Sequence, residues 1–158
     1  MSVAAKSLTG EPLGSTMVKA MIGGAVAVAI TRFAMDPIAL SMFGVTFAAP
    51  GIYAFMLKSA FGVDSNIVAG WAVHLAVFVI LVPILSVMPL RRIGSAGQVF
   101  MALSAAFLVW LLLMIVLLPA GGLPFFYAFS LTTIWSGVAF AILGLSIAAA
   151  LSLLPGKE

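Results

Sequence analysis

The sequence predicts an all-α integral membrane protein, a four-helix bundle that forms one transmembrane domain over residues 1–158. Hydrophobic residues make up 65% of the chain and charged residues 7%, and the mean hydropathy is +1.33, values outside the range of water-soluble domains. Four apolar runs reach the roughly 20 residues with which a helix crosses a bilayer. The period-two alternation of a membrane β-barrel is absent from these runs, so each is expected to be a helix.

The first span is expected over about residues 17–35. It carries a face of small side chains, formed by Ala20, Gly23, Gly24 and Ala27. Small residues that share a helical face let a second helix approach closely in a membrane. Gly24 and Ala27 are therefore candidate interface residues, which face either another span of this chain or a partner.

Arg32 and Asp36 close the first span and lie about one helical turn apart, so they are expected to form an ion pair. Pro37 follows directly and is expected to end the helix, which places the pair near the membrane interface. The preferred interpretation is a structural ion pair with a snorkelling arginine. A proton or ion relay, an intersubunit contact and a lipid-headgroup site, where guanidinium suits phosphate, are the alternatives.

The connector over residues 37–63 is apolar but broken by Gly44, Pro50 and Gly51. Its longest uninterrupted piece, residues 52–61, is too short to cross a bilayer. We therefore expect a re-entrant or interfacial segment between the first and second spans. A fifth crossing is the alternative.

The remaining spans are expected over about residues 66–90, 99–118 and 125–154. Aromatic residues open the last of these runs, as in an interfacial belt: Phe125, Phe126, Tyr127 and Phe129.

The charge distribution predicts the orientation of the bundle. Four spans place both termini and the loop between the second and third spans on one side. Most basic residues collect on that side: Lys6, Lys19, Arg91, Arg92 and Lys157. The positive-inside rule then places both termini in the cytoplasm and the protein in the inner (plasma) membrane.

His74 is the only histidine of the chain and lies about 12 Å along the second span, counted from Asn66. An ionisable ring at this depth is costly unless it is satisfied. The preferred interpretation is a neutral imidazole that hydrogen-bonds a neighbouring helix or a buried water. Contact with a partner subunit, haem or metal ligation and proton transfer are the alternatives.

Five ionisable residues are expected near one end of the bundle, because the first span ends there and the second begins there. They are Arg32, Asp36, Lys58, Asp64 and His74.

No catalytic residue and no metal site is expected. The chain has no cysteine, and its methionines are scattered, as is usual for methionine that fills apolar packing. Its few carboxylates are dispersed, and phosphate-loop, metalloprotease and serine-hydrolase motifs are absent. We expect no enzyme activity from the isolated chain and no binding to nucleic acid.

Gly70, Trp71 and His74 belong to the sequence GWAVH in the second span. With a first span rich in small residues and a broken apolar connector, this motif resembles a group of small, poorly characterised four-span bacterial membrane proteins. The resemblance covers roughly the first two spans and implies a four-span fold without an assigned activity. This chain lacks the further histidine in the last span that the group would lead one to expect.

The leading functional hypothesis is a non-catalytic accessory subunit of a larger membrane complex, such as a respiratory or other electron-transfer assembly. Its expected partners are membrane lipids and other integral membrane subunits, and no cofactor of its own is expected. The second hypothesis is a small homo-oligomeric transporter or channel-like protein that uses Arg32, Asp36 and His74. The third is a haem b protein in which two copies each contribute His74.

Overall fold

The computed structural model describes residues 12–44, 49–87 and 95–154, and all the regular elements in these ranges are helices. In chain order the elements are α1 (Leu13–Ile30), η2 (Thr31–Met35), α2 (Asp36–Phe43), α3 (Ala49–Phe61), α4 (Ile67–Leu75), η3 (Ala76–Leu81), α5 (Val82–Val87), α6 (Ser95–Leu112), η5 (Leu113–Leu117), α7 (Leu118–Ala120), η6 (Phe125–Phe129) and α8 (Leu131–Leu153).

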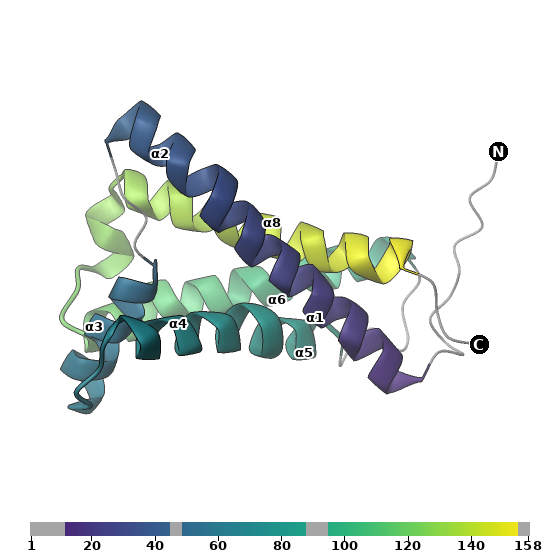
Figure 1. The fold of residues 1–158 in the computed structure, drawn as a ribbon, viewed down its shortest axis with the longest axis horizontal. Helices are drawn as coiled ribbons and strands as arrows, with labels where there is room; N and C mark the ends of the chain where they lie inside the picture. Colours follow the sequence, from purple (N-terminus) through teal and green to yellow (C-terminus); the bar gives the residue numbers. More distant parts are fainter. Residues whose placement is uncertain (1–11, 45–48, 88–94, 155–158) are drawn as a thin grey trace.

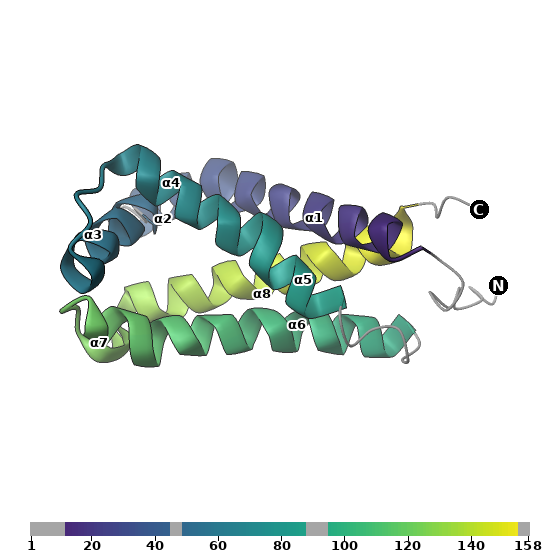
Figure 2. The same cartoon turned by 90° about the horizontal axis from the view of Figure 1, so that it is seen from below.

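Four stretches in the described residues are long and apolar enough to cross a membrane: Leu13–Phe43, Ile67–Val87, Gly97–Ala120 and Leu131–Leu153. Each of these spans packs against the next one in the chain, and α8 packs back against α1 to close the bundle. The beginning of α1 and the end of α8 lie at one end, while α2, α3 and α7 lie at the other (Figures 1 and 2). The predicted all-α bundle with four spans is confirmed.

The small-residue face of α1 is used inside this chain. A Cβ added to Gly23 would lie 2.6 Å from the Cα of Ile147 in α8, and one added to Gly24 would overlap the carbonyl oxygen of Phe78 in η3. Ala20 and Ala27 are fully buried beside them. The face therefore joins the first span to the second and fourth spans, and the structure uses it within a single copy.

Pro37 does not end the first span, because the helix continues to Phe43. The reason is a π-helical turn, in which the Asp36 N–H donates to the carbonyl five residues back rather than four. Proline lacks an N–H, and its ring clashes with the carbonyl four residues back in a regular α-helix, so a wider turn accommodates it. The second and third spans repeat the arrangement, with η3 before Pro83 and η5 before Pro119.

The fourth span begins at Leu131 and not near residue 125. Phe125–Phe129 instead forms a separate turn in which Phe126, Tyr127 and Ala128 have φ of 47°, 49° and 54°. This left-handed backbone is costly for residues with a Cβ. The stacked rings of Phe126 and Phe129, 5.4 Å apart between centroids, accompany the turn, and the Thr133 hydroxyl donates to the Phe126 carbonyl.

The connector between the first two spans forms the helix α3, which packs against α4 (Figure 2). Its 13 residues rise about 20 Å, too little to cross a bilayer. Among the described residues no fifth candidate span is found, so the short connector helix agrees with the expected re-entrant or interfacial segment.

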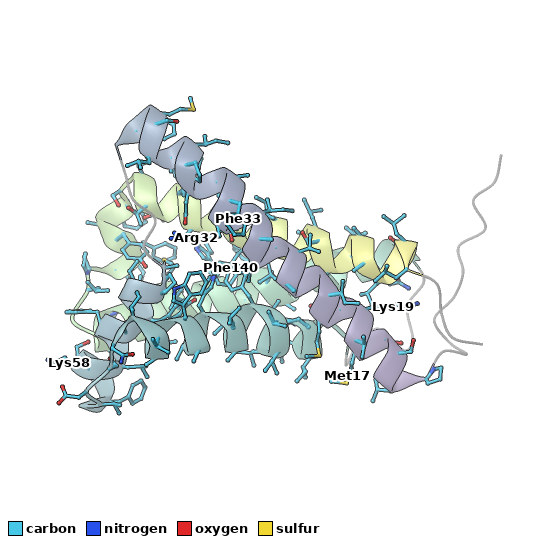
Figure 3. The ribbon with its side chains drawn as sticks, viewed as in Figure 1. Met17, Lys19, Arg32, Phe33, Lys58 and Phe140 are labelled. Carbon is cyan, nitrogen blue, oxygen red and sulfur yellow. The ribbon has the colours of Figure 1, made fainter. Side chains whose placement is uncertain are left out.

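Four of the residues behind the predicted orientation, Lys6, Arg91, Arg92 and Lys157, lie outside the described ranges. The side on which the termini lie therefore stays a prediction. Lys19 is 5% exposed on α1, close to the end of the bundle at which α8 finishes (Figure 3).

Candidate functional site

A cavity of about 40 Å³ lies inside the bundle, at the end where α2 and α3 are found. All four spans, together with α3 and η6, contribute residues to its wall. The wall is mainly apolar, but it also holds a set of polar or amphipathic side chains: Thr31, Arg32, Asp36, Tyr53, Trp71, His74, Tyr127 and Ser136. This cavity is the candidate functional site, because it collects polar groups that are rare in the rest of the bundle.

Arg32 and Asp36 form the ion pair that their spacing predicts, with 2.8 Å between Nη1 and Oδ2. The Arg32 side chain is 51% exposed and that of Asp36 is 18% exposed, so the pair borders the cavity rather than lying deep within it. The Arg32 guanidinium also lies over the indole of Trp71, 5.8 Å from the ring centroid, within the range of a cation–π contact. The pair leaves this side of the cavity without net charge.

His74 lies deeper and is 6% exposed. Aromatic rings surround its imidazole, with centroids 4.4 Å away for Phe78 and 5.7 Å away for both Tyr53 and Trp71. Its Nδ1 is buried and has no hydrogen-bond partner among the described residues. The expected partner is a neighbouring helix or a buried water. The described helices supply no hydrogen bond at this atom, and the buried water stays a prediction. A buried nitrogen without a hydrogen-bond partner is costly.

One other buried side-chain nitrogen, Nε1 of Trp135, also lacks a partner in the described part of the chain. Trp135 does not line the cavity. Its ring packs edge-on against Phe43 of α2, 5.8 Å between centroids. The unsatisfied nitrogen of His74 differs because its side chain forms part of a cavity wall.

Both tyrosines of the chain line the cavity, although their sequence positions do not point to a site. Tyr53 comes from α3 and Tyr127 from the left-handed turn η6. Burial raises the pKa of Tyr127 to about 12 and also raises the pKa of Tyr53, with a further contribution from the nearby Tyr127. Both phenols are therefore neutral near pH 7 and can act as uncharged hydrogen-bonding groups.

The hairpin between α3 and α4 places Tyr53 beside His74. A Cβ on Gly70 would overlap the carbonyl oxygen of Pro50, so the two helices touch through backbone atoms. The Asn66 side chain caps α4 by accepting from the N–H groups of Val68 and Ala69 at 3.0 and 3.1 Å. Gly70 in the GWAVH sequence thus has a packing role, while His74 and Trp71 on the same helix line the cavity.

The structure divides the five ionisable residues that are expected to gather. Arg32, Asp36 and His74 line one cavity, whereas Lys58 and Asp64 form a separate, exposed pair 3.7 Å apart. Figure 3 shows Arg32 on the first span and Lys58 on α3, away from Arg32. No group of three or more metal-binding side chains occurs among the residues that the structure describes.

Buried side chains fill the bundle between the cavity and the end at which α1 begins and α8 finishes. His74, Phe78 and Val82 follow one another at successive turns of the second span, and the last two are 2% and 0% exposed. Phe78 packs against Phe140 of α8 at 5.1 Å between centroids. Leu143 and Ile147 continue the fully buried layer along α8. This filled layer separates the cavity from the end of the bundle at which α1 begins and α8 finishes.

Comparisons with protein-family models, with curated proteins and with solved structures give no match.

Proposed function

We propose that this protein is a non-catalytic membrane subunit that holds a small amphipathic molecule between its helices. One observation carries the proposal: His74, whose buried Nδ1 has no hydrogen-bond partner in the described residues, lines a cavity together with Arg32 and Asp36. Buried polar groups are nearly always satisfied. A bound group that supplies the missing hydrogen bond accounts for the arrangement.

The proposal retains the hypothesis of an accessory subunit in a larger membrane complex, such as a respiratory or other electron-transfer assembly. Most of the described residues belong to the four candidate spans, so a partner would mainly meet the outer faces of these helices. Large apolar side chains such as Phe33, Phe107 and Leu153 are exposed along these helices. The small-residue face of α1 is not available for a partner, since it is buried within the bundle.

The two other hypotheses receive less support from the geometry. A passage through one copy would have to cross the filled layer formed by Phe78, Val82 and Leu143. A haem shared by two copies would require His74 at the outer surface, but this side chain is 6% exposed and enclosed by three aromatic rings.

Purification of the native protein in a mild detergent tests the proposal. Small molecules extracted from the purified protein are identified by mass spectrometry, co-purifying subunits by peptide mapping, and haem by an absorption spectrum. We expect an amphipathic molecule in a fixed ratio to the chain, together with larger membrane subunits and without a Soret band. A Soret band that follows this chain would favour the haem hypothesis, and a protein free of bound amphiphile would contradict the proposal.

A further inference from the structure

A second, apolar cavity of about 120 Å³ lies beside the first and shares three of its wall residues, Tyr53, Leu113 and Phe140. It is formed between α3, the second span and the third span. Exposed side chains at its rim, Phe61 and Leu112, open it toward the outer surface of the bundle. We call this second cavity the apolar groove. A polar cavity and an apolar groove that share walls match the two parts of an amphipathic molecule.

We propose that the ligand is an uncharged single-chain amphiphile whose head group is a hydroxyl or a carbonyl oxygen, an inference that rests on the proposed function. The head group occupies the cavity at His74, and the chain lies in the apolar groove along α3. A long-chain alcohol and a neutral lipid carbonyl share this chemistry.

The size of the cavity limits the head group. A volume of about 40 Å³ accommodates a water-sized group, whereas a cavity that binds benzene measures roughly 150 Å³. A hydroxyl or carbonyl oxygen therefore fits the space as it stands. A phosphate, a sugar or a quinone ring would require Tyr53, Trp71 or their helices to move.

The charge at the cavity also limits the head group. Arg32 is already paired with Asp36 at 2.8 Å. Because these two side chains neutralise each other, a charged head group would lose its hydration without gaining an unpaired counter-charge from the described cavity wall. An uncharged head group leaves the ion pair intact.

The hydrogen-bonding capacity of the cavity suits a single neutral oxygen. A neutral imidazole nitrogen either donates or accepts one hydrogen bond, and a hydroxyl can serve as the partner in both cases. The Nδ1 of His74 has this capacity unused in the described structure. The neutral phenol of Tyr53 lines both the cavity and the groove, where the head group would join the chain.

Photo-cross-linking with three matched probes tests the inference. Each probe carries the same photoreactive alkyl chain, and its head group is a hydroxyl, a carboxylate or a trimethylammonium group. The full-length protein is placed in phosphatidylcholine nanodiscs and labelled sites are mapped by mass spectrometry. We expect the alcohol to label α3 and the facing part of the third span about tenfold more than either charged probe. A tenfold ratio is of the size that one hydrogen bond contributes.

Substitutions separate the head-group site from the chain site. His74→Leu should reduce labelling by the alcohol about tenfold, while His74→Gln, which keeps a hydrogen-bonding group, should retain most of it. Val77→Phe should fill the apolar groove and block labelling without altering His74. The matched control is Ala141→Phe, which fills a different apolar groove, between α6 and α8, and should leave labelling of α3 unchanged.

The outcomes distinguish failure of the inference from failure of the proposed function. Equal labelling of the apolar groove by all three probes overturns the head-group assignment but leaves amphiphile binding intact. Stronger competition by a short-chain quinone than by the unlabelled alcohol overturns the size argument. Labelling of α3 no greater than labelling of the groove between α6 and α8 overturns both the inference and the proposed function. Retained labelling in a folded His74→Leu protein overturns the role of His74.

Discussion

The backbone of Gly70 in α4 lies directly against the carbonyl oxygen of Pro50 in α3, leaving no room for a side chain on Gly70. This contact fixes the short helix α3 to the second span. It also sets the position of Tyr53 beside His74, whose rings are 5.7 Å apart between centroids. The shape of the candidate site therefore depends on a glycine that is not part of the cavity wall.

Gly70→Ala should separate α3 from α4, because the added Cβ would overlap backbone atoms that cannot change rotamer. Overpacking of this kind costs about 1–3 kcal/mol, and we expect the free energy of unfolding to fall by at least that amount. Unfolding of the purified protein by titration with sodium dodecyl sulfate, followed by circular dichroism, measures the change.

Gly137→Ala in α8 is the matched control for this substitution. A Cβ on Gly137 would meet only the Trp110 side chain, at an ordinary contact distance of 3.6 Å. Alanine is favoured over glycine inside a helix by about 1 kcal/mol, so the control should be neutral or stabilising. Equal losses at both positions would show that α3 is not held by the contact between Gly70 and Pro50.

The ion pair between Arg32 and Asp36 should contribute little to stability, since the Arg32 side chain is half exposed. We expect Asp36→Asn to reduce the free energy of unfolding by about 0.5 kcal/mol, within the range of exposed ion pairs. Arg32→Gln should cost about 1 kcal/mol, because it also removes the contact with Trp71. A double-mutant cycle should give a coupling energy below about 1 kcal/mol. Coupling of several kcal/mol would indicate a pair that is buried by a partner or by lipid.

Ala128→Gly should stabilise the protein, because Ala128 has φ of 54°. Glycine adopts this left-handed conformation without the penalty that a Cβ incurs, so we expect a gain of about 1 kcal/mol. Ala149, an exposed residue within α8, provides the control. Ala149→Gly should cost about 1 kcal/mol. A loss of stability in both variants would argue that residue 128 has a helical backbone.

The sequence predicts the four spans because apolar length alone determines them, but it misplaces two of their ends. Pro37 reads as a helix stop, yet a π-helical turn before it lets the helix continue. The aromatic residues from 125 to 129 read as the start of the fourth span, yet they form a left-handed turn. Both errors arise from local backbone geometry, which hydropathy and residue spacing do not report.

The candidate site is predicted in part. Arg32, Asp36 and His74 stand out in the sequence because ionisable residues are rare in apolar runs. Tyr53 and Tyr127 do not stand out, because Tyr53 lies in the broken connector and Tyr127 in the aromatic run. The two tyrosines reach the cavity because α3 and η6 fold back against the bundle. A usable signal exists in the composition, since these are the only two tyrosines of the chain.

His74→Leu should make the ligand-free protein at least as stable as the wild type. An unsatisfied buried polar group costs about 1–3 kcal/mol, which leucine removes. Loss of the ring contact with Phe78 costs about 0.5–1.5 kcal/mol in return. The midpoints of these two ranges differ by about 1 kcal/mol, so we expect the free energy of unfolding of delipidated protein to rise by about that amount.

The same substitution should lower the amount of amphiphile that co-purifies, and this opposition between stability and binding is the signature of a side chain kept for a ligand. A histidine kept for packing alone gives a different result: His74→Leu would then change stability without changing the bound amphiphile. A large loss of stability in His74→Leu, together with recovery in His74→Gln, would show that Nδ1 hydrogen-bonds the protein itself. In that case the main observation behind the proposed function, the unpartnered Nδ1 of His74, would no longer hold.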